Sequence, residues 1–147
     1  MSLAEFLSWD DGTDARYELV GGRAVKQPLV HARRGLMIGN AAGEIDRRLA
    51  VRPSCAAVAD PFLVVEILSE ADPDRWALIK VHDYAALASV QEIWLIDGRR
   101  RHVEQWWRSA EDRWIVRLPL TGSATFDSPS LAGEPVALDR LYRNTGL

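Results

Sequence analysis

The chain has 147 residues, of which 48% are hydrophobic and 27% charged, a composition typical of a globular domain and not of a disordered tail. No apolar stretch approaches the roughly 18 residues of a membrane-spanning helix, and the N-terminus lacks the basic and apolar segments of a signal peptide. The net charge of −3 argues against tight binding to nucleic acid through bulk charge alone. The single cysteine, Cys55, has no partner for an internal disulfide, which fits a reducing, cytoplasmic setting.

The first part of the chain predicts a helix, a hairpin and a second, longer helix. Ser2 is suited to cap the first helix, and Gly21-Gly22 is suited to the hairpin turn. Apolar residues recur at helical spacing through the second helix. The predicted elements are a helix over residues 2–9, strands over 16–20 and 23–27, and a helix over 31–50.

Glycines form a second, smooth face on the long helix. Gly35, Gly39 and Gly43 fall four residues apart, and each costs about 1 kcal/mol relative to alanine inside a helix. Something should therefore pack closely against this face. The two interpretations are packing of the helix on the sheet and a helix–helix contact in a dimer.

The rest of the chain predicts a mixed sheet. The segment 62–68 is the strongest strand and is apolar on both faces apart from Glu66, as expected of a central strand that is covered on both sides. The order predicts an α/β (α+β) single domain over residues 1–147, with helices on the faces of the sheet and a C-terminal antiparallel meander. The predicted elements are strands over 55–59, 62–68, 91–96, 102–107 and 113–118, and helices over 72–88 and 138–142.

Glu66 and Lys80 are the main candidates for chemistry. A carboxylate inside an apolar strand must be paired, protonated or bound to a metal, because an unpaired buried charge costs many kcal/mol. The structural alternative places Glu66 near the end of the strand, paired with an arginine. Lys80 shares a helix face with Trp76 and Tyr84. It either extends its charge to solvent or places an ammonium beside Glu66.

These residues resemble the Uma-type endonucleases, a restriction-endonuclease-like branch of the PD-(D/E)XK superfamily. The segment from Val64 to Asp97 carries the most specific part of the resemblance, which runs in order from about Phe6 to Trp107. The matching segments are Val64–Ser69, similar to VVEVLS; Lys80-x-x-x-Tyr84, similar to the K-x-x-x-Y helix; Ala88–Asp97, similar to xSVxEYWLVD; Arg100–Glu104, similar to RRVE; Tyr17–Arg23, similar to YELVDGR; and His31 at the start of the first long helix.

The resemblance implies an endonuclease that hydrolyses DNA phosphodiesters with Mg²⁺ on a restriction-endonuclease-like fold. Acidic residues on neighbouring strands would bind the cation, since Mg²⁺ prefers hard oxygen ligands. The resemblance implies that Glu66 is a metal ligand and that Lys80 stabilises developing charge. Asp60 is the candidate for the second ligand. The resemblance also implies Glu18, Tyr84 and His31 as residues at the edge of the site.

The chain departs from the family pattern before Glu66. It lacks the Pro-Asp strand of the branch, and the nearby acid is Asp60, in the reversed order Asp60-Pro61. In one interpretation Asp60 reaches the metal, with help from Glu18 or Glu44. In the other the first ligand is lost, Glu66 and Lys80 remain as a buried ion pair, and the protein is an inactive homodimeric binding or assembly module on the same fold.

Two further groups of residues have both a structural and a functional interpretation. His31 either simply begins a helix or contacts phosphate at the site edge. Arg99, Arg100 and Arg101 follow a tight-turn signal, Asp97-Gly98, and are either a solvated turn or contacts to the phosphates of DNA. We also expect a homodimer and no association with membranes.

Overall fold

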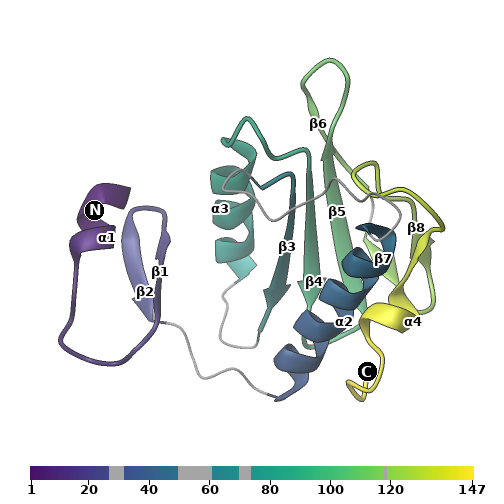
Figure 1. Cartoon of the computed structure of the whole chain (residues 1–147), viewed down its shortest axis with the longest axis horizontal. Coiled ribbons are helices and arrows are strands. Elements are labelled where there is room, and N and C mark those ends of the chain that lie inside the picture. Colours follow the sequence, from purple (N-terminus) through teal and green to yellow (C-terminus); the bar gives the residue numbers. More distant parts are fainter. Residues whose placement is uncertain (27–31, 50–60, 70–73, 118) are drawn as a thin grey trace.

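The computed structural model describes residues 1–26, 32–49, 61–69, 74–117 and 119–147, with the backbone alone at 74–76. Figure 1 shows a mixed sheet with helices on its faces and an N-terminal unit beside it. The strand predicted over 55–59 lies outside the described residues. None of the helices in the described part is long and apolar enough to cross a membrane.

The main sheet is mixed, as predicted. β3 and β4 are parallel, β4 and β5 are antiparallel, and β5 pairs antiparallel with both β6 and β7. The strands are β3 (Leu63–Leu68), β4 (Glu92–Asp97), β5 (His102–Arg108), β6 (Trp114–Val116) and β7 (Leu120–Thr121).

Helices cover the two faces of this sheet, and each face has its own apolar core. Side chains alternate along a strand, so β4 sends Trp94 and Ile96 to one core and Ile93 and Leu95 to the other. The first core also contains residues of α2 (Ala32–Leu49) and α4 (Leu138–Leu141), and the second contains residues of α3 (Asp74–Ala85).

The buried central strand of the described sheet is β4. All six of its residues are buried, whereas five of the six residues of β3 are only partly buried. Within the described residues β3 pairs with β4 alone, and Phe62 before it is 55% exposed. Among the described strands, 62–68 is therefore an edge strand rather than the predicted central one, although both of its faces are covered as predicted. The segment is apolar because helices pack on both faces of β3. The hydrophobic pattern of such an edge strand is the same as that of a central strand.

The N-terminal unit has the predicted helix and hairpin. Ser2 caps α1 (Leu3–Ser8) in a capping box with Glu5, and β1 (Tyr17–Val20) pairs with β2 (Arg23–Lys26). Gly21 and Gly22 have φ of 54° and 74°. A two-residue hairpin turn with two positive φ values favours glycine, so the turn is fixed by its sequence.

The long helix α2 has the predicted span, and its buried face is partly charged. Met37, Ala41, Glu44 and Arg48 are buried, whereas Ile38 is 47% exposed. A charged pair, Glu44 and Arg48, occupies half of this face. A Cβ added at Gly39 or Gly43 would meet no described atom within 4 Å. The expected close packing of these glycines on the sheet is therefore wrong within the described residues.

The C-terminal segment closes over the α2 side of the sheet. β8 (Thr125–Phe126) pairs with β9 (Val136–Ala137), which leads into α4. Glu92 ties this segment to the sheet and is 0% exposed. Its carboxylate accepts four hydrogen bonds, from Trp94 Nε1 at 2.6 Å, Gln105 Nε2 at 2.7 Å, Ser128 Oγ at 2.6 Å and the Ser130 amide at 2.9 Å.

Candidate active site

Glu66 lies on the α3 face of the sheet. Its neighbour Ile67 belongs to the α2-side core, and Val64 and Leu68 pack on the α3 side, so the alternation of the strand directs Glu66 toward α3. Lys80 Nζ lies 3.0 Å from Glu66 Oε1, and the Tyr84 hydroxyl donates to Oε2 at 2.9 Å. The predicted pairing of Lys80 with Glu66 is present, and the i,i+4 spacing places Tyr84 beside it.

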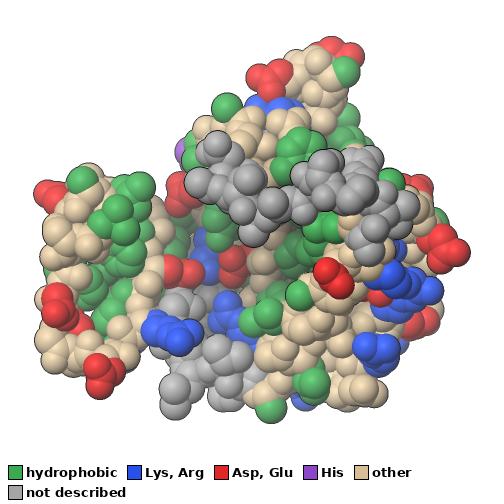
Figure 2. All heavy atoms as spheres, in the orientation of Figure 1, with side chains coloured by type: hydrophobic (Ala, Val, Ile, Leu, Met, Phe, Trp, Pro, Cys, Tyr) green, Lys and Arg blue, Asp and Glu red, His purple; other side chains and the backbone are tan. Residues whose placement is uncertain are grey.

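The N-terminal hairpin supplies a second carboxylate to the same lysine. Lys80 Nζ lies 2.7 Å from Glu18 Oε1 of β1. One ammonium therefore bridges acids from two separate sheets. Figure 2 shows a recess between the N-terminal unit and the main body in which acidic and basic side chains lie side by side. Glu18 is the more open of the two acids, with its side chain 29% exposed against 11% for Glu66.

Arg34 is a member of the cluster that the sequence analysis missed. It comes from the first turn of α2, and its Nη2 lies 3.8 Å from Glu66 Oε1. The sequence offered no direct signal, because arginines are frequent throughout the chain. Only the position of the start of α2 next to β3 brings this arginine to the carboxylate.

The protonation states follow from burial and charge. Burial of Lys80 lowers its pKa, but the hydrogen bond to Glu18 and the charge of Glu66 outweigh this, so the pKa is raised overall. Burial and the charge of Glu66 raise the pKa of the Tyr84 hydroxyl. At neutral pH Lys80 is charged and Tyr84 is a neutral donor. The two cations, Lys80 and Arg34, then formally balance Glu18 and Glu66.

Three other predicted residues are not part of this cluster as described. Asp60 and His31 lie outside the described residues. Glu44 is described and lies elsewhere: it is 7% exposed and forms ion pairs with Arg48 and Arg47 on α2. Glu44 is therefore a structural ion-pair residue and not a second metal ligand beside Glu66.

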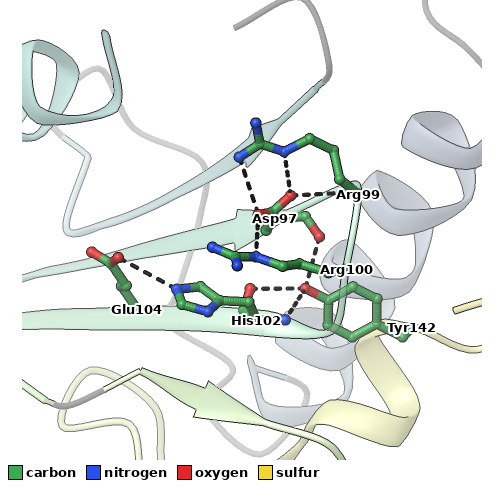
Figure 3. A network of polar contacts seen from close by, with 6 residues as sticks. All are labelled: Asp97, Arg99, Arg100, His102, Glu104 and Tyr142. Carbon is green, nitrogen blue, oxygen red and sulfur yellow. Dashed lines mark hydrogen bonds and ion pairs between the residues drawn. The ribbon is translucent and has the colours of Figure 1, made fainter. Parts of the chain in front are cut away.

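The three arginines after β4 already have acidic partners. Arg99 Nε and Arg100 Nε lie 2.9 Å and 3.1 Å from the carboxylate of Asp97, and Arg101 pairs with Asp139. Figure 3 shows the two arginines converging on Asp97. Burial would raise the pKa of Asp97, but the hydrogen bonds from Arg99 outweigh this and hold it low.

Arg99 and Arg100 also border a cavity of about 260 Å³ on the α3 side of the sheet. His102 and Glu104 also line it, with His102 Nε2 3.4 Å from Glu104 Oε1. The side chain of Arg100 is 69% exposed, so its guanidinium is open to solvent while paired. Contacts from these arginines to phosphate remain a prediction.

Comparisons with known proteins agree with the resemblance in the sequence. The family model described as "Uma2: Putative restriction endonuclease" matches residues 41–136, which include Glu66, Lys80 and Tyr84. A structural neighbour is "a putative nuclease belonging to DUF820 from Anabaena variabilis ATCC 29413", with a TM-score of 0.71, 14% identity and 97% of each chain covered. The fold is shared with that nuclease. No curated protein matches. With its match over most of the chain, this protein belongs to the Uma2 family of restriction-endonuclease-like proteins.

Proposed function

We propose that this protein hydrolyses phosphodiester bonds of DNA with the help of Mg²⁺, at the cluster around Glu66. The supporting observation is the Lys80 ammonium held 3.0 Å from the Glu66 carboxylate, in a chain of a restriction-endonuclease-like family. An acid beside a buried lysine provides both a ligand for a cation and a fixed positive charge for a phosphate.

The donors of the cluster fit Mg²⁺. The ion takes hard oxygen ligands and is commonly bound through one or two carboxylates, with water and substrate phosphate completing its shell. Glu66 and Glu18 supply two carboxylates. Lys80 and Tyr84 use one hydrogen-bond position on each oxygen of Glu66, and an ionised carboxylate has about four such positions. Glu66 and Glu18 would hold the ion, and Asp60 remains a proposed ligand outside the described residues.

Each side chain of the cluster then has a distinct role. When bound, Mg²⁺ acidifies a water molecule and polarises the phosphate. Lys80 stabilises the negative charge that develops on the phosphate, because its ammonium is fixed before substrate binds. Tyr84 holds Glu66 in place through the hydrogen bond of 2.9 Å. Glu18 orients Lys80 from the hairpin.

Nicking of supercoiled plasmid with Mg²⁺ or Mn²⁺ tests this proposal. We expect the wild-type protein to nick. Lys80→Ala should lose about a hundredfold in rate or more, the usual cost of removing a fixed charge-stabilising group, and Glu66→Gln should lose at least as much, because it removes a carboxylate that would hold the ion. Glu111→Gln serves as the matched control, because the side chain of Glu111 is 67% exposed. Circular dichroism establishes that each variant is folded. No nicking by wild type, or nicking unchanged in both variants, would contradict the proposal.

A second candidate function is a non-catalytic homodimeric binding or assembly module on the same fold. The observation that favours it is that no group of three or more His, Cys, Asp or Glu side chains suited to a metal occurs among the described residues. It predicts a dimer by light scattering and no heat of Mg²⁺ binding by calorimetry. A monomer with a clear Mg²⁺ isotherm would exclude it.

A further inference from the structure

We propose that Arg34 contacts a phosphate of the DNA bound at Glu66, an inference that rests on the proposed nuclease function. Arg34 is close enough to Glu66 to sense its charge but does not hydrogen-bond to it, since Nη2 is 3.8 Å from Oε1. Its Nε is buried and has no hydrogen-bond partner in the part of the chain that the structure describes. The side chain is only 18% exposed.

Two other largely buried arginines, Arg48 and Arg108, donate hydrogen bonds within the chain. Arg48 donates to Glu44 and to the carbonyls of Glu134 and Pro135. Arg108 donates to Asp112 and to backbone carbonyls between Ala85 and Val90. Buried polar groups in native proteins are nearly always hydrogen-bonded. Arg34 differs from both, because its Nε has no hydrogen-bond partner among the described residues. A guanidinium whose donors are not used within the chain is suited to an acceptor on a bound ligand.

The geometry at Glu66 separates Arg34 from the two side chains that bond to this carboxylate. Lys80 and Tyr84 lie 3.0 Å and 2.9 Å from its oxygens, whereas Arg34 Nη2 lies at 3.8 Å. A guanidinium presents a planar fork of donors that matches the oxygens of a phosphate. Arg34 also comes from α2, whereas Lys80 and Tyr84 come from α3. The phosphate would therefore be held by cations from two helices.

Binding of fluorescein-labelled DNA, measured by anisotropy without cleavage, tests this role. Single-stranded and duplex 20-mers are titrated in EDTA and in Ca²⁺, as a function of salt. We expect Arg34→Ala to weaken binding about tenfold to a hundredfold, as for other charge-assisted hydrogen bonds, and to reduce the salt slope by about one phosphate contact. Arg34→Lys should recover part of the affinity, because it keeps the charge but loses the fork.

The neighbouring Arg33 provides the matched control. Its Nε donates to the carbonyl of Thr145 at 3.2 Å, at the C-terminal end of the chain. Arg33→Ala removes the same charge from the same helix turn, and we expect it to keep the wild-type affinity and salt slope within about twofold. Equal losses in Arg33→Ala and Arg34→Ala would overturn the proposal, since they would reflect net charge alone.

A double variant separates phosphate binding from simple charge balance with Glu66. In a Glu66→Gln background the carboxylate charge is gone, so an arginine that only balances it has no further role. We expect Arg34→Ala to weaken DNA binding in this background as well. Unchanged binding there, or no DNA binding by wild type in either buffer, would overturn the role of Arg34. DNA binding that depends on Arg34 without any nicking would instead contradict hydrolysis and leave the phosphate contact standing.

Discussion

Two glutamates on opposite faces of the same sheet show how differently a protein can accommodate a carboxylate. Glu92 is 0% exposed and accepts four hydrogen bonds from neutral groups of β4, β5 and the C-terminal segment. Glu66 lies near the surface, and its partners are an ammonium, a phenol and a more distant guanidinium. The donors of Glu92 are all neutral, whereas two of the three partners of Glu66 are cations.

The difference indicates which acid is structural and which is suited to chemistry. Glu92 is saturated, so a ligand would have to break hydrogen bonds that join three parts of the fold. The carboxylate of Glu66 keeps free lone pairs and lies near solvent. A second acid, Glu18, contacts the same lysine. A buried carboxylate whose hydrogen bonds join separate parts of the chain helps to specify the fold, whereas a charged cluster with donors and acceptors remaining can bind a substrate.

The largest expected effect is on stability at Glu92. Glu92→Gln places an amide NH₂ among four donors, and we expect a loss of about 3–4 kcal/mol, as for other broken buried networks. Glu66→Gln should cost only about 1–2 kcal/mol, because Lys80 keeps Glu18 as a partner. Urea denaturation at pH 7 measures both. If Glu66→Gln were as destabilising as Glu92→Gln, the distinction between the two acids would fail.

Lys80→Met should have the next largest effect. It leaves Glu18 and Glu66 without their shared cation, and we expect a loss of about 2–3 kcal/mol, below the full cost of breaking a buried pair because Arg34 and Tyr84 remain. A double variant with Glu66→Gln should lose less than the sum of the two single variants. Strict additivity in this cycle would show that the two side chains are not coupled.

The pH dependence of stability should reveal the same cluster. The pKa values of Lys80 and Tyr84 are raised in the folded protein, the first despite burial and the second because of it. Their stabilising contribution is therefore complete below their unfolded pKa values and is lost as the pH rises through the folded ones. We expect the free energy of unfolding to fall above about pH 10, and to fall less in Tyr84→Phe. The exposed Lys26→Met is the control and should keep the wild-type profile. A profile for Tyr84→Phe identical to wild type would contradict this coupling.

The smallest expected effect is at Glu18. Its side chain is 29% exposed, so solvent screens the ion pair and we expect Glu18→Gln to cost about 1 kcal/mol or less. Thermal unfolding measures this value. A loss as large as that of Lys80→Met would mean that Glu18 in the hairpin, and not Glu66 in β3, is the main stabilising partner of Lys80.

Local patterns in the sequence predicted the elements better than their arrangement. The capping box of Ser2, the Gly21-Gly22 turn and the strands around Asp97-Gly98 were predictable because each depends on a few adjacent residues. The position of β4 as the buried central strand was not, since its apolar run resembles that of β3. Sheet order depends on tertiary pairing, which one sequence does not encode locally.

The candidate site was predictable in part for the same reason. Glu66, Lys80 and Tyr84 follow from one strand and one helix with i,i+4 spacing, and the family resemblance added Glu18. Arg34 depends on where α2 begins relative to β3, which only the folded chain shows. Glu92 was missed because nothing in its local sequence distinguishes a saturated acid from a solvated one.

The most direct test of the central claim is a crystal soaked with Mn²⁺ and a short DNA strand, examined by anomalous scattering. Mn²⁺ takes the carboxylate and water ligands that Mg²⁺ takes. We expect an anomalous peak within ligand distance of the Glu66 carboxylate and none beside Glu92. A peak elsewhere in the molecule, with Glu66 still bound only to Lys80 and Tyr84, would contradict the assignment of this cluster as the site of phosphodiester hydrolysis.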